Sequence, residues 1–499
     1  MNLLKCCWRK RWLRRLAWAL VVFVALCFLF CAWVNWSGAR QWHATQVMLK
    51  AQGETLDFRA TAKEPIPESE NFCAIPLLKD LALVVDGDVN KGEPGEKRKR
   101  LNALKLPPKS KAGANPRQAN PALGKPADLK QWAEWLRKEG FSGMPADSGD
   151  AARDVLAALA KHDALINELA ASISRTGAQW TPEWKTRELP PLLPMIALPH
   201  YTVVQGLSGT LGLRASAALR TGDTAKAHES ALILARISLA SVNDPFLIGL
   251  LVGISGAARL HGTVWELCME HAGTAEDFAK LETALVALDF RRATLSAFRS
   301  EMAAMVNTVR VFKTGRAIHW YPSGFFDAGA ARVAELEFRH VIKPLKEAGW
   351  HEAIASDAAL DAEFSAMRQK FWTRPTHVIA ELVLPVWSSA LAKAAYSDAL
   401  QNQAIIACAL ERHRIQNASY PDSLNAVRLV DGKPLPPDPM DGKPMRYRKT
   451  ADGRYALWSI GIDGKDDGGK RTLDQKKPED TDFHKAVYIG DWVWDFPAQ

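Results

Sequence analysis

Near its C-terminus the chain contains the stretch YALWSIGIDGKDDGG, residues 455–469. The first six residues are mostly aromatic and apolar, a composition that fits a half-buried β-strand, and they follow closely on an Asp-Gly pair at Asp452. Asp-Gly accepts the positive φ values of tight hairpin turns. We therefore predict an antiparallel hairpin of Met445–Arg448 and Tyr455–Ile460, followed by an acidic loop and a last strand at Ala486–Trp494.

Three further motifs flank this hairpin. They are a Tyr-Pro-x-Ser-Leu element that starts at Tyr420, the run PPDPMDGKPMRY over residues 436–447, and the closing GDWVW that starts at Gly490. Together with the quoted stretch, they resemble the globular C-terminal part of type II secretion G-type pseudopilins, over roughly the last hundred residues. The resemblance implies a small α+β module at residues 385–499, in which the sheet packs on a long helix, Val386–Gln416, and a loop binds calcium.

The chain departs from that family at its other end. A pseudopilin joins its membrane segment directly to the long helix and carries a processed leader, whereas the apolar segment of this chain lies far upstream and no such leader motif occurs. We therefore do not expect the protein to polymerise as a pilus subunit does. A shared fold does not by itself carry a function with it.

The acidic loop is the strongest chemical signal in the sequence. Asp463, Asp466 and Asp467 place three carboxylates within five residues, where they repel one another unless they are neutralised. Calcium accepts six to eight oxygen ligands in flexible geometry, which suits carboxylates and carbonyls on a Gly-rich loop. The resemblance adds Asp491, so the predicted calcium ligands are Asp463, Asp466, Asp467 and Asp491. The alternative is a solvated acidic turn that the interspersed lysines neutralise.

The N-terminus predicts a membrane anchor. Residues 1–15 contain six basic residues and no acid, and Leu16–Val34 is uncharged and free of Gly and Pro. Such a run is long enough to cross a bilayer core of about 30 Å. The cations should remain in the cytoplasm, which places residues from about 37 onward outside the cytoplasmic (inner) membrane. A cleaved signal peptide is the alternative, because Ser37-Gly38-Ala39 resembles a cleavage site. We favour an uncleaved single-pass anchor at residues 16–36.

The positive charge has two local sources. The formal net charge of +9 comes from residues 1–15 and from a Lys-rich stretch between residues 91 and 130, and the rest of the chain is slightly acidic. A nucleic-acid partner is therefore not expected. Residues 86–127 are also rich in Gly, Pro and Asn, so we predict a disordered basic insertion. The alternative is a basic arm that contacts anionic lipid or an acidic protein.

The centre of the chain is helical in pattern. Residues 37–85 predict a juxtamembrane helix and an extended segment, and residues 128–384 predict an array of helical hairpins. The clearest pair is Leu207–Leu219 and Thr224–Leu239, joined around Gly222. The expected fold class is thus mainly α, with an N-terminal transmembrane helix, an extracytoplasmic hairpin array, and a small C-terminal α+β module with a short antiparallel sheet.

No known catalytic motif is complete in this sequence. Each His-Glu pair, at His228 and His351, lacks the second His of a zinc-protease motif. His261, Glu266 and His271 could face one another on one helix, although such residues more often pack in a core or lie at a surface. We therefore predict that the protein is not an enzyme and identify no small-molecule substrate.

The sequence favours a membrane-anchored binding or scaffolding protein of the cell envelope, with an envelope or secretion-associated protein as its partner. The alternative is an envelope hydrolase whose active site is assembled from distant residues. A deep pocket that gathers His, Glu or Asp would favour the hydrolase.

Overall fold

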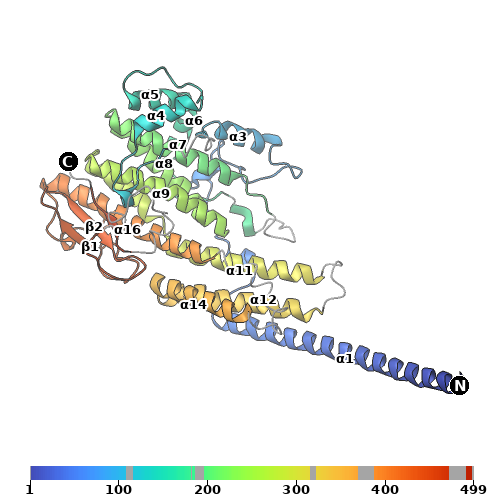
Figure 1. The fold of residues 1–499 in the computed structure, drawn as a ribbon. Helices are drawn as coiled ribbons and strands as arrows, with labels where there is room; N and C mark the ends of the chain where they lie inside the picture. The colour runs from blue at the N-terminus through green and yellow to red at the C-terminus, as the bar shows by residue number, and fades with distance from the viewer. Residues whose placement is uncertain are drawn as a thin grey trace.

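The computed structural model describes residues 2–107, 116–180, 182–185, 196–314, 322–368, 387–470 and 490–496. The chain is mainly helical, with a three-stranded antiparallel sheet near the C-terminus and a long apolar helix at the N-terminus, as predicted. Figure 1 shows the sheet at the end of the body that lies farthest from the N-terminus.

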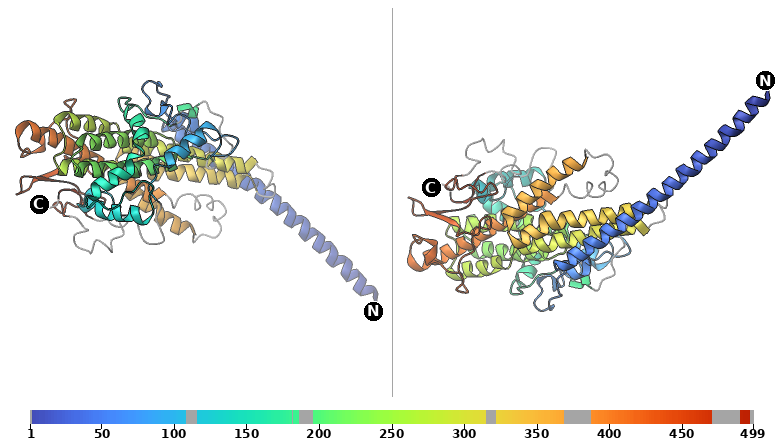
Figure 2. Two further views of the ribbon diagram at one scale, coloured as in Figure 1. Left: turned by 90° about the horizontal axis from the view of Figure 1, so that it is seen from above. Right: turned by 90° about the horizontal axis from the view of Figure 1, so that it is seen from below.

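Helix α1 (Asn2–Ala51) is a single continuous rod. Its first half extends away from the body in every view, and its second half lies along α12 (Gly324–Glu337) (Figures 1 and 2). We expected a membrane segment followed by a separate juxtamembrane helix. The structure instead continues one helix through Trp36, and the buried residues Val34, Thr45 and Leu49 recur at helical spacing along the face that packs on the body.

Among the residues that the structure describes, two helices are long and apolar enough to cross a membrane by length and composition. The first lies within α1, whose large apolar side chains between residues 16 and 30 are exposed. The second is α9 (Leu247–Met269), and most of it is buried inside the body. The long apolar helix α1 is therefore consistent with a membrane anchor, whereas α9 is placed as a core helix.

The central helices form the main core. Helices α7 (His200–Arg220) and α8 (Thr224–Val242) make the predicted hairpin: Gly222 has a φ of 81° and the Asp223 carboxylate caps α8 by accepting from the Lys226 amide. Helices α10 (Ala275–Val286), α11 (Phe290–Thr314) and α12 follow.

The remaining helices surround this core. They are α2 (Phe58–Thr61), α4 (Leu129–Lys138), α5 (Ala151–Ala160), α6 (Asp163–Ala170), α13 (Lys343–Glu347) and α14 (Trp350–Arg368), with short turns at η1 (Phe72–Ala74), η2 (Pro121–Leu123), η3 (Pro182–Lys185), η6 (Phe338–Ile342) and η9 (Leu424–Ala426). Helix α14 begins at Trp350, directly after Gly349 at a φ of 108°.

The segment expected to be a disordered basic insertion, residues 86–127, is ordered wherever the structure describes it. It forms α3 (Gly92–Asn102), and the buried Arg98 guanidinium donates to the carbonyls of Leu81, Leu83 and Val89. Leu101 also lies in the core. The prediction of disorder was wrong here, because a buried arginine that holds three carbonyls anchors a segment with few apolar residues. Residues 108–115 lie outside the described residues.

The C-terminal sheet is joined to the body through one long helix, α16 (Trp387–Asn417). Strands β1 (Arg446–Lys449), β2 (Tyr455–Ser459) and β3 (Trp492–Trp494) pair antiparallel in that order, close to the predicted hairpin. Residues 486–489 of the predicted last strand lie outside the described residues. Helix α16 packs against α9, α10 and α11 on one side and contacts β3 on the other, where Gln403 Nε2 donates to the Trp492 carbonyl at 2.7 Å.

Candidate functional site

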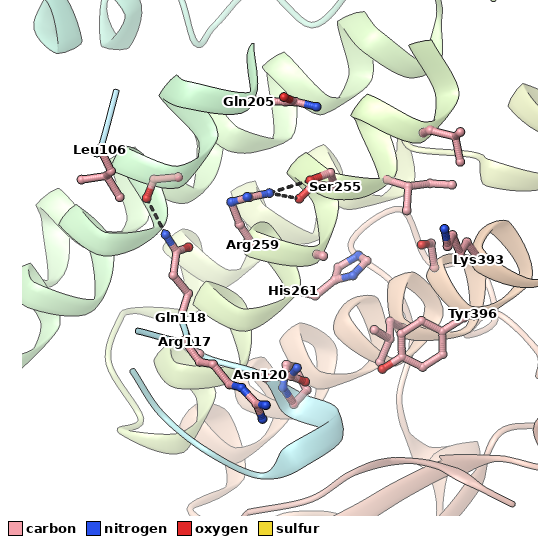
Figure 3. Close-up of a pocket in the computed structure, with 18 of the residues that line it drawn as sticks. Leu106, Arg117, Gln118, Asn120, Gln205, Ser255, Arg259, His261, Lys393 and Tyr396 are labelled. Carbon is pink, nitrogen blue, oxygen red and sulfur yellow. Dashed lines mark hydrogen bonds between the residues drawn. The ribbon is translucent and has the colours of Figure 1, made fainter. Parts of the chain in front are cut away.

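A cavity of about 1130 Å³ lies where α7, α9 and α16 meet the chain around residues 105–121 (Figure 3). Helix α9 lines it with residues spaced three or four apart, from Leu251 through Ser255 to Arg259. Helix α16 does the same from Ser389 to Leu400. This spacing places one face of each helix on the cavity. Of the cavities in the described part of the chain, we take this one as the candidate binding site, because pockets of this size hold small molecules.

The chain around residues 105–121 is held against the helices by close backbone approach. A Cβ on Gly262 would lie closer than 3.0 Å to the carbonyl oxygen of Ala119, so only glycine allows this contact. Gln118 Nε2 donates to the Gly209 carbonyl at 2.6 Å, and Trp132 Nε1 donates to the Arg117 carbonyl at 3.1 Å. These contacts fix the wall of the cavity that carries Arg117.

Four cations line the cavity, Lys105, Arg117, Arg259 and Lys393, and the described lining includes no carboxylate. Arg259 is partly buried, and burial lowers the pKa of its guanidinium. Its Nη1 donates only to Ser255, at 2.5 Å to the carbonyl oxygen and 2.8 Å to Oγ (Figure 3). Within the residues that the structure describes, none of the four cations forms an ion pair. The cavity therefore carries uncompensated positive charge.

His261 supplies a neutral hydrogen-bond acceptor to the same cavity. It is 1% exposed, and burial lowers the pKa of its imidazole to about 4, so the ring is neutral at pH 7. Gln401 Nε2 donates to the Leu285 carbonyl, so Gln401 Oε1 accepts from His261 Nε2, at 2.7 Å. This arrangement leaves His261 Nδ1 as the unprotonated nitrogen, and it has no hydrogen-bond partner among the described residues.

His261 and Glu266 on α9 and His271 just after it are not brought together. His261 bonds to Gln401, Glu266 accepts from the Ser216 hydroxyl and the Ala127 amide, and His271 lies 3.3 Å from Glu411. Each of the three therefore has partners of its own outside α9. A metal role for this trio therefore has no geometric basis.

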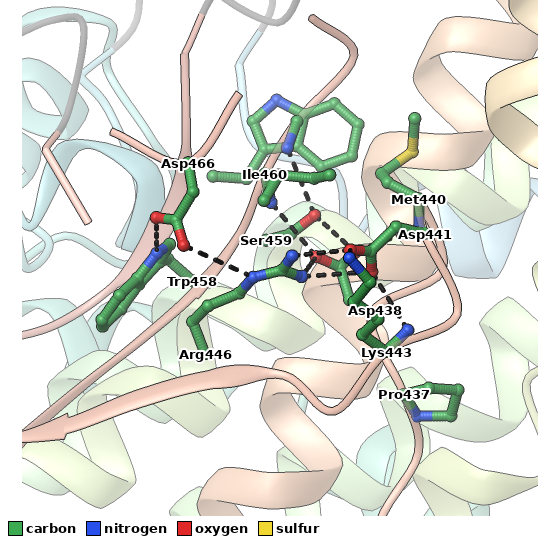
Figure 4. A network of polar contacts seen from close by, with 12 residues as sticks. Pro437, Asp438, Met440, Asp441, Lys443, Arg446, Trp458, Ser459, Ile460 and Asp466 are labelled. Atoms are coloured by element: carbon green, nitrogen blue, oxygen red, sulfur yellow. Dashed lines mark hydrogen bonds and ion pairs between the residues drawn. The ribbon is translucent and has the colours of Figure 1, made fainter. Parts of the chain in front are cut away.

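The acidic loop lies beside a polar network that is centred on Asp438 (Figure 4). The Asp466 carboxylate accepts from Trp458 Nε1 at 2.8 Å and from the Gly468 amide at 3.0 Å, and it lies 3.7 Å from the Arg446 guanidinium. The hydrogen bond from Trp458 contributes most to lowering the pKa of Asp466. Asp466 is thus ionised and already has donors.

The other predicted calcium ligands also accept hydrogen bonds from the backbone. Asp463 accepts from the amides of Lys465 and Gly490, both at 3.1 Å, and Asp491 Oδ2 accepts from the Gly469 amide at 2.7 Å. Burial raises the pKa of Asp491, and the nearby carboxylates of Asp466 and Asp467 raise it further. Asp491 Oδ1 is buried without a donor among the described residues.

Across the described ranges, no group of three or more His, Cys, Asp or Glu residues is arranged to hold a metal ion. The structure brings Asp466, Asp467 and Asp491 into electrostatic range of one another but not into a ligand cluster. Calcium binding at this loop therefore stays a prediction.

We expect calcium, if it binds, to raise the melting temperature of the full-length protein, because a ligand that binds only the folded state stabilises it. The measurement is thermal unfolding in detergent with calcium, with magnesium, and with a chelator. Asp463→Asn should remove the calcium-dependent rise, while magnesium, which demands a more regular octahedral site, should have little effect. Equal melting temperatures in calcium and in chelator would contradict the prediction that the loop binds calcium.

Sequence reasoning missed the cavity, although one weak signal pointed to it. Lys105 and Arg117 belong to the basic segment that was considered as an arm for anionic lipid. Arg259 and Lys393 lie on helices far along the chain and carry no motif. Only tertiary packing places these four side chains around one space.

Comparisons with protein-family models, with curated proteins and with solved structures find no match for this chain. The class of protein is therefore inferred from the geometry of α1, of the cavity and of the acidic loop.

Proposed function

We propose that this protein is a single-pass, membrane-anchored binding or scaffolding protein of the cell envelope, with its N-terminus in the cytoplasm and its body outside. The observation that carries the proposal is α1, an apolar rod with exposed side chains from residue 16 to 30 that continues directly into a segment packed on the body. A free rod of this composition is stable in a bilayer, where a helix satisfies its own backbone hydrogen bonds.

The contact between α1 and α12 supports a body that lies close to the membrane surface. Asn35, the residue after the apolar run Leu16–Val34, accepts at Oδ1 from the Gly324 amide at 2.8 Å and from Ser323 Oγ at 3.2 Å. Asn35 therefore caps the N-terminus of α12. The C-terminal end of the proposed bilayer segment therefore lies beside the first turn of α12. The Asn35 cap joins the two helices directly, without a flexible linker.

The cavity supports binding rather than hydrolysis. His261 is the one histidine in the described lining, which includes no carboxylate, and burial lowers the pKa of His261 to about 4. General acid–base catalysis needs groups with pKa values near the working pH, held beside a nucleophile. The arrangement fits recognition of an anionic ligand better. The pseudopilin-like motifs of the sheet support a secretion-associated protein as partner.

The topology can be tested with reporters fused after Gln499. Alkaline phosphatase is active only outside the cytoplasm, so we expect its fusion to be active. A fusion to a fluorescent protein that folds only in the cytosol should not fluoresce. Removal of residues 1–36 is the control and should abolish phosphatase activity. A second measurement distinguishes an uncleaved anchor from a cleaved signal peptide. If the anchor is uncleaved, an N-terminal tag should stay on the full-length protein, and the protein should remain in the membrane fraction after carbonate extraction. A bright cytosolic reporter or a soluble mature protein would overturn the proposal.

A further inference from the structure

We propose that the cavity between α7, α9 and α16 binds an amphiphile that carries one anionic head, a phosphate or a carboxylate, on an apolar chain. The inference rests on the proposed binding function and names the ligand class of the same site. It depends on three features of the cavity: its charge, its buried acceptors and its apolar wall.

The charge of the cavity calls for an anion. Arg259 on α9 and Lys393 on α16 are both partly buried, line the cavity from different helices (Figure 3), and lack a carboxylate partner in the part of the chain that the structure describes. Lys105 and Arg117, which are exposed, stand at its edge. Leaving charges partly buried and unpaired is costly, and an anionic ligand removes that cost. A guanidinium also matches phosphate and carboxylate oxygens in bidentate geometry.

Two buried acceptors define what the ligand must donate. His261 Nδ1 and Gln118 Oε1 both line or border the cavity, and neither has a donor among the described residues. Buried polar atoms are almost always hydrogen-bonded, so each is suited to a hydroxyl or amide of a ligand. Because the His261 imidazole is neutral, it can accept a hydrogen bond from the ligand and does not form an ion pair with the anionic head.

The remaining wall is apolar and large. Leu106, Leu251, Ile254 and Leu400 line the cavity together with the ring of Tyr396. A free phosphate or carboxylate would fill only a small part of about 1130 Å³ and would leave this apolar surface in contact with water. A chain attached to the anionic head would cover it. The anchored position of the body beside the bilayer supplies such amphiphiles from the membrane surface.

The test uses the full chain in nanodiscs of phosphatidylcholine, with isothermal titration of four probes: octyl phosphate, octanoate, the neutral octyl glucoside, and inorganic phosphate. Empty nanodiscs correct for partitioning. We expect one anionic amphiphile to bind once per chain, at least tenfold tighter than octyl glucoside and than inorganic phosphate, and more weakly in high salt. The tighter of octyl phosphate and octanoate identifies the head group.

Arg259→Gln should weaken that binding at least tenfold. The matched control is Arg236→Gln, which removes another buried arginine that donates only to the carbonyls of Ile173 and Thr176, away from the cavity. Arg236→Gln should leave the affinity unchanged. If Arg259→Gln does not fold, Lys393→Gln on α16 is tested instead, and we expect its affinity for the anionic amphiphile to fall severalfold.

Three results would overturn the inference: equal binding of octyl glucoside, equal binding of inorganic phosphate, or an unchanged affinity of the folded cavity variants. If none of the four probes binds, the proposed ligand class is wrong. The reporter fusions test the membrane topology independently, so the ligand proposal and the anchor proposal can be contradicted separately.

Discussion

Asp438→Ala is expected to destabilise the C-terminal sheet by about 3–5 kcal/mol, because each unsatisfied buried donor costs roughly 1–3 kcal/mol. Asp438 is fully buried and accepts four hydrogen bonds: from the Met440 and Ile460 amides at 3.0 and 3.1 Å, from Ser459 Oγ at 2.7 Å, and from Arg446 Nη1 at 2.6 Å (Figure 4). Alanine leaves the two amides and the hydroxyl without an acceptor. The Arg446 guanidinium keeps Asp441 as a partner.

Hydrogen exchange measures this effect locally. The amides of Met440 and Ile460 should lose protection in Asp438→Ala, and the melting temperature of the sheet should fall. The control is Asp431→Ala, where the exposed carboxylate bonds to Lys433 alone among the described residues, and it should change little. Unchanged protection in Asp438→Ala would show that the network does not hold the strands together.

Gly38→Leu is expected to separate helix α1 from α12, at a cost of about 3 kcal/mol, the upper end of the range for overpacked cores. A Cβ on Gly38 would lie closer than 3.0 Å to backbone atoms of Gly324, and a Cβ on Gly324 would meet the backbone of Val34 and Asn35 in the same way. Backbone cannot move aside as a side chain can. Helices α1 and α12 must therefore part, and the Asn35 cap on α12 is lost with them.

Limited proteolysis and spin-label distances between α1 and α12 report this change. Gly38→Leu should increase cleavage near residues 37–51 and broaden the interhelical distance distribution. Ala39→Leu is the matched control, since Ala39 is exposed on the same turn of α1 and the larger side chain meets no neighbour there. A wild-type distance in Gly38→Leu would show that the two helices do not approach as closely as the structure places them.

Local patterns were enough to predict several elements. The α7–α8 hairpin forms around Gly222 as predicted, and the Asp223 carboxylate caps α8 by accepting from the Lys226 amide, three residues on. The hairpin around Gly453, at a φ of 79°, follows the Asp-Gly signal. These features succeed because caps and turns depend on neighbouring residues alone.

Composition misled where a long-range contact decided the outcome. The basic segment around Arg98 was expected to be disordered, yet Arg98 reaches the carbonyls of Leu81 and Leu83 and is buried. Cys268 and Cys408, which are far apart in the sequence, lie against each other where α9 meets α16. Neither contact has a periodic signature, because its partners come from separate elements.

Hydrophobic length, helical period and turn residues act locally along the chain, so the apolar helix at Leu16–Val34, the helical body and the sheet could be predicted from the amino-acid sequence. The cavity that gathers Lys105, Arg259 and Lys393, and the hydrogen bond by which Asn35 caps α12, follow from tertiary packing. Packing brings together side chains from distant elements, and the charge and burial of each then depend on neighbours that the linear order does not reveal.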